Sequence, residues 1–539
     1  MRNVFVAATF LSLFGAFSNT YAQTGPAGIG TGDGSIAPRN VLWLKADVGV
    51  TQSSNKVSAW ADQSGNGLNA AQANGTWQPT YTASNANLNN KPSINFGPTG
   101  TTNYNLAVND NSLLDWSSAM SFFLVIRTES SGVQGILNKR TGVGANQSYR
   151  LFRNSGSISA DISDGGTANV SVTDNTNYVI STTYDHTLSG NKFFLNRNSV
   201  TSSGTNVTTP LPDNASPLYI GNFNLSDNRS FPGDIAEVII YNGAVSAPQR
   251  VIVENMLGHK YGINLTTNDI FGNLGTYNTS YFTQYRGLGT VDGTDKVTSA
   301  TSDALQIREV NSSLDAGEFV AFAHDGTAHA DGLATQIGAG VTSRWARSWY
   351  TEVSQSGVVN GGGVNAELLF DFSDAGLTYS GNLNEYVLLY RSDVSANFTS
   401  IYVDKYSLES GDKVVVSIPA SRFKSGYYTL GKGTQLTSKT WYVFQDGDWS
   451  NSATWTLDAS TAPIVKNPGN NIPGAEDDVI IRSGRTVTVQ PATNNITVNS
   501  MEVRGNLYLT TSTGHNFKTI NGNGQIRLQG NGGTANFPA

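Results

Sequence analysis

Short hydrophobic segments separated by polar turns dominate residues 41–241. Clear examples are VLWLKA at 41–46, SFFLVIRT at 121–128, YVISTTYD at 178–185 and DIAEVIIYN at 234–242. Clusters of Gly, Asn, Asp and Ser lie between these segments, and no helical period runs through them. Frequent short strands with polar turns predict an antiparallel sandwich of two sheets. We assign this first sandwich to residues 36–263.

One helix is predicted to close this region. Ser246 followed three residues later by Gln249 is a capping-box pattern. Gly262 suits the position after the last helical turn. Between these ends, apolar side chains recur every four residues, at Val253, Leu257 and Tyr261. The pattern predicts a helix that docks on the sandwich.

Residues 264–433 also show the pattern of β-structure. The segments LQIREV, GEFVAFAHD, AELLFDF, EYVLLYRS and KVVVSIP are the clearest strands, and Gly-rich turns separate several of them. A second β-sandwich is the simplest interpretation. The polar run that follows, at residues 434–440, is predicted to be a linker.

Residues 441–539 differ, because their strands are very short and are spaced by Gly or Asn turns. TVTVQP, ITVNSMEVRGNLYLTT and FKTINGNGQIRL show this spacing without any intervening helix. Such segments are typical of successive rungs of a parallel β-helix. The repeats stop without a cap, so we expect the sequence to be the N-terminal part of a longer protein, with this module truncated.

Composition limits the possible partners. The chain has 539 residues and only 14% charged residues, and its net charge is −7. That balance offers no electrostatic basis for holding a nucleic acid backbone. Cysteine is absent from the sequence, which excludes disulfides, thiolate zinc sites and a cysteine nucleophile.

The N-terminus predicts export. Arg2 precedes an apolar stretch at residues 4–17, and Ala22 provides a small residue at a cleavage point. This arrangement is typical of a secretory signal peptide over residues 1–22. The stretch is too short for a transmembrane helix, and no later segment is apolar enough. We therefore expect a secreted or cell-surface protein with no membrane span, which begins with a flexible Gly-rich lead at residues 23–35.

Several motifs resemble a known family. VLWLKADVGV, VSAWADQSGNGLNA and GDIAEVIIYNGAVSAPQRVIVENMLGHKYGI resemble the laminin-G-like, concanavalin-A-like domains of secreted Bacteroidetes proteins. The resemblance implies a jelly-roll fold for the first sandwich and a large surface protein, often an adhesin. It also implies export by the type IX secretion machinery of gliding bacteria. The expected fold class is all-β: two antiparallel sandwiches followed by the start of a parallel β-helix.

A calcium site is one interpretation of the loop around residue 64. Asp62, Ser64 and Asn66 place oxygen atoms on alternate positions, while the intervening glycines allow carbonyl groups to turn inward. Ca²⁺ prefers six to eight such oxygen ligands. The resemblance implies that the last strand adds Asp234 or Glu237, giving a structural calcium ion. The alternative is a turn held by side-chain hydrogen bonds, without a metal.

Other chemical signals are weak. Asp234 and Glu237 are three residues apart, so on a regular strand they face opposite sides and cannot form a catalytic pair without a bulge. The histidines of HDGTAHAD, His324 and His329, have no evident further zinc ligands, and we expect a solvated loop. The sequence contains no GxSxG, HExxH or phosphate-loop motif.

Aromatic side chains are the other route to ligand binding, because sugar rings stack on exposed aromatic faces. Trp77 lies in the polar segment GTWQPTY and is the surface candidate. Trp43 lies in an apolar strand and is expected to pack in a core. Trp345 and Trp349 in RWARSWY are four residues apart and so point the same way on a strand, which also favours core packing.

These observations favour a non-enzymatic adhesin whose modules form a carbohydrate-binding or surface-binding stalk. Its expected partners are an extracellular polysaccharide or a surface glycan, besides the secretion machinery. Two alternatives stay open. The chain could be an accessory region of a secreted polysaccharide-degrading enzyme, or a spacer without a ligand.

Overall fold

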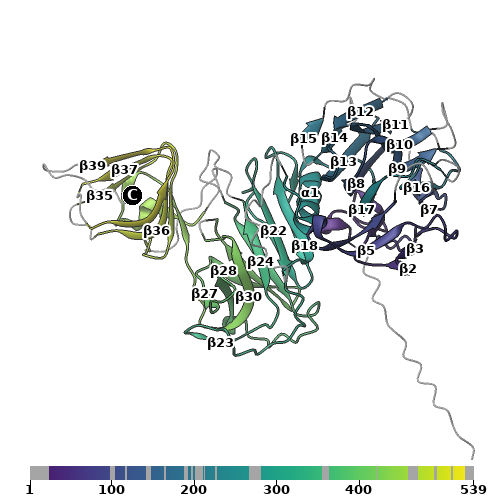
Figure 1. Ribbon diagram of the computed structural model, residues 1–539. Helices are drawn as coiled ribbons and strands as arrows, with labels where there is room; N and C mark the ends of the chain where they lie inside the picture. The colour runs from purple at the N-terminus through teal and green to yellow at the C-terminus, as the bar shows by residue number, and fades with distance from the viewer. Residues whose placement is uncertain are drawn as a thin grey trace, which may run out of the picture.

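The computed structural model contains three β-rich modules in series, with the second between the first and the third (Figure 1). It describes residues 24–97, 103–115, 118–140, 147–162, 166–186, 192–195, 198–200, 211, 213–224, 228–265, 281–354, 363–420, 422–458, 471–490, 495–510 and 514–528. The predicted signal peptide lies outside the described residues. In the described part of the chain, no helix has both the length and the apolar character needed to cross a membrane.

The first module is a sandwich in which every pairing of the named strands is antiparallel. One layer contains β1 (Arg39–Lys45), β17 (Gly233–Asn242), β8 (Ala119–Thr128), β13 (Asn177–Asp185), β14 (Lys192–Leu195) and β15 (Asn198–Val200), with β6 (Lys91–Asn95) and β5 (Thr80–Asn85) along β17. The other layer contains β4 (Ala70–Ala71), β7 (Leu106–Val108), β16 (Leu218–Ile220), β9 (Gly132–Arg140), β10 (Gln147–Ser155), β11 (Ser157–Ile162) and β12 (Gly166–Ser171). The hairpin β2 (Val50–Ser53) and β3 (Lys56–Trp60) joins them. The side chains that the two layers direct toward each other form one continuous core.

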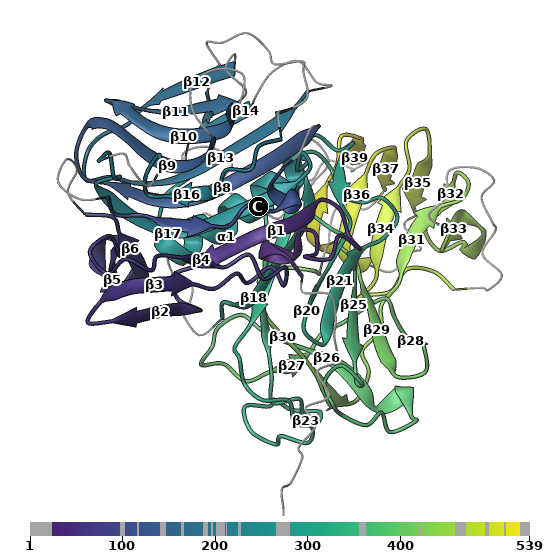
Figure 2. The same ribbon diagram turned by 90° about the vertical axis from the view of Figure 1, so that its right-hand side faces the viewer.

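The second module is the predicted second sandwich (Figure 2). One sheet holds β18 (Thr283–Thr290), β19 (Lys296–Val297), β22 (Phe319–His324), β23 (Val341–Arg344), β24 (Trp349–Val353), β26 (Tyr386–Arg391), β27 (Thr399–Ser400) and β30 (Gly426–Gly433). The other holds β20 (Ser299–Ser302), β21 (Leu305–Glu309), β25 (Ala366–Asp371), β28 (Lys405–Glu409) and β29 (Lys413–Ile418). Aromatic and aliphatic side chains fill the space between the sheets. The predicted linker packs on this module, because Ser438 N donates to Val403 O at 2.7 Å.

The third module is built from parallel strands. One sheet contains β33 (Trp455–Thr456), β31 (Thr440–Val443), β34 (Asp478–Ile481), β36 (Thr497–Val503) and β38 (Asn516–Asn521), and only its β31–β33 pairing is antiparallel. The other contains β32 (Gly447–Asp448), β35 (Thr486–Val489), β37 (Asn506–Leu509) and β39 (Gln525–Leu528). Consecutive strands alternate between the sheets from β34 onward, and their inward side chains form a separate core.

The Gly-rich lead differs from its prediction, because its described part is folded rather than flexible. Residues 26–28 form the short 3-10 helix η1 (Pro26–Gly28), and Ala27 and Ile29 are buried. Arg286 of the second sandwich donates from Nη2 to Thr24 Oγ1 at 2.7 Å. Small residues let this segment lie close to its neighbours, so a composition typical of flexibility here serves packing.

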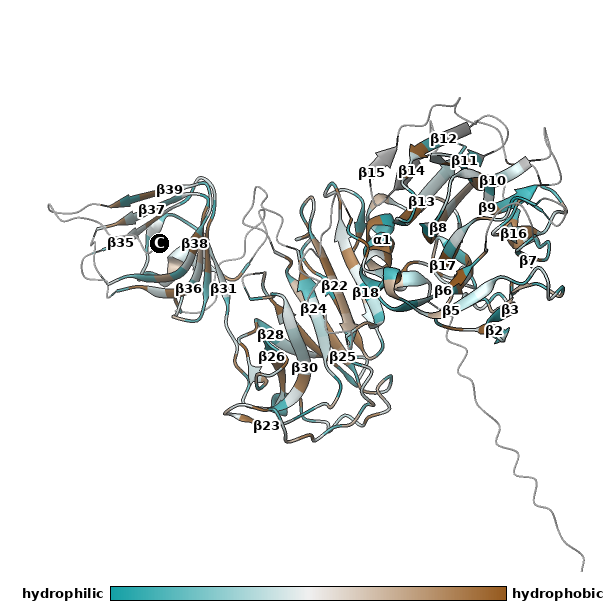
Figure 3. Ribbon diagram, in the orientation of Figure 1, coloured by the Kyte–Doolittle hydropathy of each residue, from teal (hydrophilic) through white to brown (hydrophobic). Residues whose placement is uncertain are grey.

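Helix α1 (Ala247–Tyr261) begins and ends as the sequence predicts. Ser246 N donates to Gln249 Oε1 at 2.9 Å, and Gly262 ends the helix with a φ of 64°. The helix does more than dock on the first sandwich, because its core also includes Tyr285, Phe319, Ala321 and Ala323 of the second sandwich. Figure 3 shows hydrophobic stretches along α1 and β22. The helix thus lies between the two sandwiches and joins them.

A buried ion pair attaches this helix to the first sandwich. Lys260 Nζ lies 2.8 Å from Glu237 Oε2 and 3.1 Å from Asp47 Oδ1, and the Tyr261 hydroxyl donates to Glu237 Oε2 at 2.8 Å. Trp43 Nε1 donates to Glu237 Oε1 at 2.7 Å. Burial alone would lower the pKa of Lys260, but attraction to Glu237 and Asp47 outweighs it and raises that pKa.

Replacing Lys260 tests this attachment. Lys260→Ala leaves the Glu237 carboxylate buried without its cation, so we expect a loss of about 3–5 kcal/mol in the free energy of unfolding. Urea denaturation followed by tryptophan fluorescence measures the change. Lys405→Ala, at an exposed lysine of β28, is the control. A loss at Lys260 no larger than that of the control would contradict the role of the pair.

Candidate functional site

A β-bulge in β17 sets the direction of both acidic side chains of the last strand. The pairing of β17 with β8 shifts between Ile235 and Glu237. Ile235 and Val238 both face the inner core, although they are three residues apart. Asp234 and Glu237 therefore both face the outer side, where α1 packs. The sequence expectation of opposite faces is wrong because the bulge adds one residue to the strand.

Despite sharing a face, the two carboxylates have separate environments. Glu237 lies under the end of α1, as described above. Asp234 lies beyond the helix in a polar cavity of about 470 Å³. Its lining comes from the ends of β5, β6 and β8, the start of β17 and the neighbouring loops: Thr80, Thr82, Ser84, Asn85, Ala86, Asn87, Asn95, Gly97, Tyr104, Arg127, Glu129 and Asp234.

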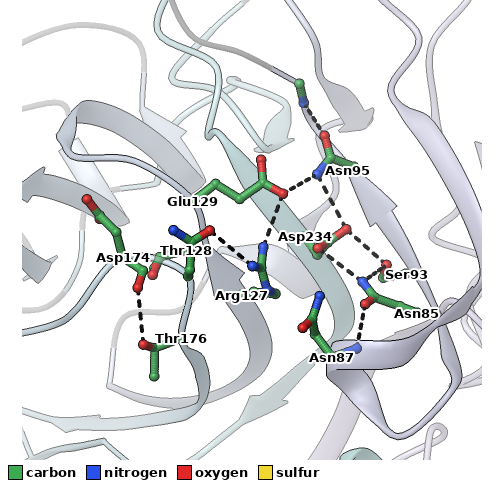
Figure 4. Close-up of polar contacts among 12 residues, drawn as sticks. Asn85, Asn87, Ser93, Asn95, Arg127, Thr128, Glu129, Asp174, Thr176 and Asp234 are labelled. Atoms are coloured by element: carbon green, nitrogen blue, oxygen red, sulfur yellow. Dashed lines mark hydrogen bonds and ion pairs between the residues drawn. The ribbon is translucent and has the colours of Figure 1, made fainter.

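Asp234 is the most deeply buried charged group of this cavity, at 4% exposure. Ser93 Oγ donates to its Oδ1 at 3.0 Å, and Asn85 Nδ2 donates to its Oδ2 at 3.1 Å (Figure 4). Asn85 Nδ2 also donates to Ser93 Oγ at 3.0 Å. These contacts hold the carboxylate in a fixed direction.

A second carboxylate, Glu129, lies on the other side of Asn95. Asn95 Nδ2 is 3.1 Å from Glu129 Oε1 and 3.5 Å from Asp234 Oδ1. Arg127 Nη1 lies 3.2 Å from the same Glu129 oxygen, and Arg127 Nη2 donates to Asn175 Oδ1 at 3.0 Å. One guanidinium and two carboxylates therefore border the cavity within one hydrogen-bond network.

One aromatic ring completes the lining. Tyr104 lies against Gly97, whose φ of 70° and closeness to the ring leave no room for a side chain, since a Cβ there would be 2.6 Å from the ring. The Lys56 ammonium lies 5.2 Å from the centre of the Tyr104 ring, outside the lining residues. Carboxylates, amides and a half-buried ring together are suited to a polar ligand with hydroxyl groups.

The cavity residues other than Asp234 were not predicted from the sequence. Asn85 ends β5, Asn95 ends β6, and Arg127 and Glu129 lie on either side of the last residue of β8, so these polar residues come from the ends of three different strands. Such residues are frequent along this chain. Their convergence depends on the order of strands in the sheet, which the sequence pattern does not specify.

The loop predicted to bind calcium is held by hydrogen bonds. Asp62 Oδ1 accepts from the backbone N–H groups of Trp43 and Ser64, at 3.0 and 2.9 Å. Asp62 Oδ2 accepts from Ser64 Oγ at 2.7 Å and from Leu68 N at 3.1 Å. Both oxygens are thus occupied by protein donors, an arrangement typical of a side-chain-capped turn.

The remaining predicted ligands do not join Asp62. Asn66 turns its Nδ2 toward the carbonyls of Asn40 and Val41, while its Oδ1 accepts from Arg39 at 2.8 Å. Asp234 and Glu237 have the separate partners given above. Among the described residues, no group of three His, Cys, Asp or Glu side chains could hold a metal ion. The four predicted residues therefore do not fit one calcium ion, and calcium binding by this chain stays an untested prediction.

Oxygen atoms do surround a cation elsewhere in the first sandwich, but that cation is a lysine. Lys139 Nζ lies 2.6 Å from Asp110 Oδ1 and 3.0 Å from Asp115 Oδ1. It also donates to the carbonyls of Asn214 and Ser216, both at 2.9 Å. The Lys139 side chain is fully buried. Its ammonium supplies the positive charge that these oxygens require.

Chelation distinguishes a turn from a metal site at Asp62. We expect Asp62→Ala to lower the free energy of unfolding by about 1.5–3 kcal/mol, because hydrogen bonds to a charged acceptor are lost. The loss should be the same with and without EDTA, measured as melting curves of the full chain. A melting temperature of the unmutated protein that falls with EDTA and returns with Ca²⁺ would contradict the turn and support the metal.

The predicted solvated histidine loop is only partly solvated. His324 is the last residue of β22 and is 2% exposed, with its Nδ1 accepting from Gly326 N at 3.0 Å. His329 contacts Asp303 through Nε2, and Arg347 contacts the same Asp303 oxygen. Burial lowers the pKa of His324 to about 4. The prediction was wrong for His324 because the strand continues into the segment assigned to a loop.

This buried histidine makes stability depend on pH. The unfolded chain binds a proton at His324 below about pH 6.5, but the folded chain resists it until about pH 4. Stability from this group is therefore complete above about pH 6.5 and is lost as the pH falls toward 4. His324→Phe should make the free energy of unfolding depend less steeply on pH between about 6.5 and 4, as measured by urea denaturation at several pH values. An unchanged slope would contradict the assignment.

The four tryptophans singled out in the sequence are buried to different extents. Trp345 and Trp349 are buried in the core of the second sandwich, as predicted, with ring centres 6.5 Å apart. Trp43 is half-buried, and its indole N–H donates the hydrogen bond to Glu237 described above. Trp77 is half-buried in a turn, where its carbonyl accepts from Asn105 N at 3.2 Å. It is not among the residues that line the cavity, and its role in ligand binding stays a prediction.

Comparison with known families covers the centre of the first sandwich. Residues 98–249 match the family model Laminin_G_3, described as the concanavalin A-like lectin/glucanases superfamily. The predicted concanavalin-A-like domain is thus confirmed over this range. No curated protein matches the chain.

Several solved structures are similar to parts of the chain at low identity. Domain 4 of AbnA, a GH43 extracellular arabinanase from Geobacillus stearothermophilus in complex with arabinotriose, is 14% identical, with a TM-score of 0.28 over 40% of this chain and 97% of that domain. The binding domain of Paraclostridial Mosquitocidal Protein 1 is 13% identical, with a TM-score of 0.31, and the match covers 72% of this chain and 97% of that domain. The Ruminococcus gnavus IT-sialidase CBM40 bound to alpha2,3 sialyllactose is 12% identical, with a TM-score of 0.24, and the match covers 29% of this chain and 91% of that chain.

Proposed function

We propose that the first sandwich is a glycan-binding module and that the cavity around Asp234 is its binding site. The observation that carries this proposal is the network of Asp234, Asn85, Asn95, Arg127 and Glu129 at a cavity on the outer face of a concanavalin-A-like domain. The fixed carboxylates can accept hydrogen bonds from sugar hydroxyls, and Tyr104 offers an apolar ring for the sugar face.

The wider assignment is a non-enzymatic, secreted or cell-surface adhesin. The apolar N-terminal stretch supports export, and the motifs named above support a Bacteroidetes surface protein that uses the type IX machinery. The parallel pairing of β34, β36 and β38 supports the start of a parallel β-helix in the third module. The same binding site would serve an accessory module of a polysaccharide-degrading enzyme, whereas a spacer would bind no glycan.

Glycan array screening of the full mature chain, followed by calorimetry with the best ligand, tests the proposal. We expect Asp234→Asn to weaken binding at least tenfold, about 1.4 kcal/mol, because it removes the charged acceptor at the base of the cavity. Asp371→Asn, in the second sandwich, is the matched control and should not change binding. Trp77→Ala tests the predicted aromatic contact in the same assay.

Each variant needs a melting curve, because Asp234 is also part of a buried network. A folded Asp234→Asn protein with unchanged affinity would reject the cavity as the binding site. Failure of the unmutated chain to bind any glycan on the array would reject the function and favour the spacer.

A further inference from the structure

The two amide groups beside Asp234 use their donors within the protein. Both N–H groups of Asn85 Nδ2 are directed to Ser93 Oγ and Asp234 Oδ2. Asn95 Nδ2 is directed to Glu129 and Asp234. The Asn85 and Asn95 side-chain oxygens accept from backbone N–H groups, those of Asn87 and Gly97. The two amides are therefore satisfied and serve to hold the carboxylates in place.

The positive charge of the cavity is used as well. Arg127 directs Nη1 to Glu129 and Nη2 to Asn175, so its guanidinium is paired inside the protein. An anionic sugar would have to compete with Glu129 for this cation. It would also approach the Asp234 carboxylate, and the two negative charges would repel each other inside the cavity.

Unused capacity remains on the acceptor side. Within the described residues, Glu129 makes its side-chain hydrogen bonds through Oε1, and Oε2 has no protein donor. The Glu129 side chain is 38% exposed, so this oxygen can meet a ligand. Asp234 accepts through both oxygens, yet a carboxylate offers about four acceptor positions. The cavity lining thus holds two carboxylates and one guanidinium, and that guanidinium is already paired with Glu129 and Asn175.

We propose that the cavity prefers a sugar that carries a free amine, such as a deacetylated hexosamine, over neutral and acidic sugars. An ammonium group supplies three donors and a positive charge, which is what the two carboxylates lack. Glu129 would take one N–H through Oε2, and Asp234 would take hydroxyl or ammonium donors deeper in the cavity. This inference rests on the proposed glycan-binding function of the same site.

Three oligosaccharides of equal length test the preference: a chitosan oligomer with free amines, a chitin oligomer with acetylated amines, and an oligouronate. Calorimetry on the full mature chain should give at least about tenfold tighter binding of the chitosan oligomer than of the chitin oligomer. The oligouronate should bind most weakly. The advantage of chitosan should shrink at high salt and at a pH above the pKa of the sugar amine, because both weaken the ion pair.

A matched pair of variants locates the effect. Glu129→Gln removes the exposed carboxylate and should lower the chitosan-to-chitin affinity ratio several-fold. Glu502→Gln is the control, because Glu502 also pairs with an arginine two residues away, Arg504, but lies in the third module. It should leave the ratio unchanged. Melting curves verify that both variants are folded.

The outcomes separate this inference from the proposed function. Equal binding of the chitosan and chitin oligomers, or tighter binding of the oligouronate, overturns the amine preference while glycan binding stands. A preference that survives Glu129→Gln also overturns the assignment of the ammonium to this carboxylate. Absence of binding to every glycan on the array rejects the function itself.

Discussion

The burial of α1 between two sandwiches is the constraint on which the rest of the structure depends. A helix with apolar side chains on nearly every face cannot remain at a surface, and here both sandwiches cover it. Close contact is possible because Gly287 faces Ile252, where a Cβ would come within 2.8 Å. The Glu237–Lys260 pair then fixes the helix in position, since each charge would be costly to bury alone. Besides their own cores, the two sandwiches therefore share the core around α1 and form a single unit.

Two carboxylates on the outer face of β17 have different roles, and the β17 bulge places both of them on that face. By adding one residue, it turns both Asp234 and Glu237 outward. Glu237 is neutralised under the helix and is structural. Asp234 lies past the helix, where neighbouring amides hold it but leave part of its acceptor capacity facing the cavity. One backbone irregularity thus provides both the attachment of α1 and the candidate site.

Carboxylates in this protein illustrate how partners, rather than residue type, decide chemistry. Asp62 has four hydrogen-bond donors around its two oxygens and caps a turn. Asp110 and Asp115 surround a lysine ammonium, and burial raises the pKa of Asp115 despite that cation. The Glu129 side chain is partly exposed, and its Oε2 has no protein donor among the described residues. Of these four, Glu129 is therefore the carboxylate placed to meet an external ligand.

The sequence by itself determined the β-rich modules and the helix, because period-2 alternation, polar turns and the Ser246 to Gln249 cap are local features. It also predicted that Trp345 and Trp349 pack in a core, since their four-residue spacing puts both rings on one side of a strand. Only the tertiary structure decided that α1 joins two sandwiches and that residues 25–32 are packed. It also decided which of many polar strand ends converge on Asp234. Strand order, the β17 bulge and competition among hydrogen-bond partners are relations between distant segments, and no local pattern encodes them.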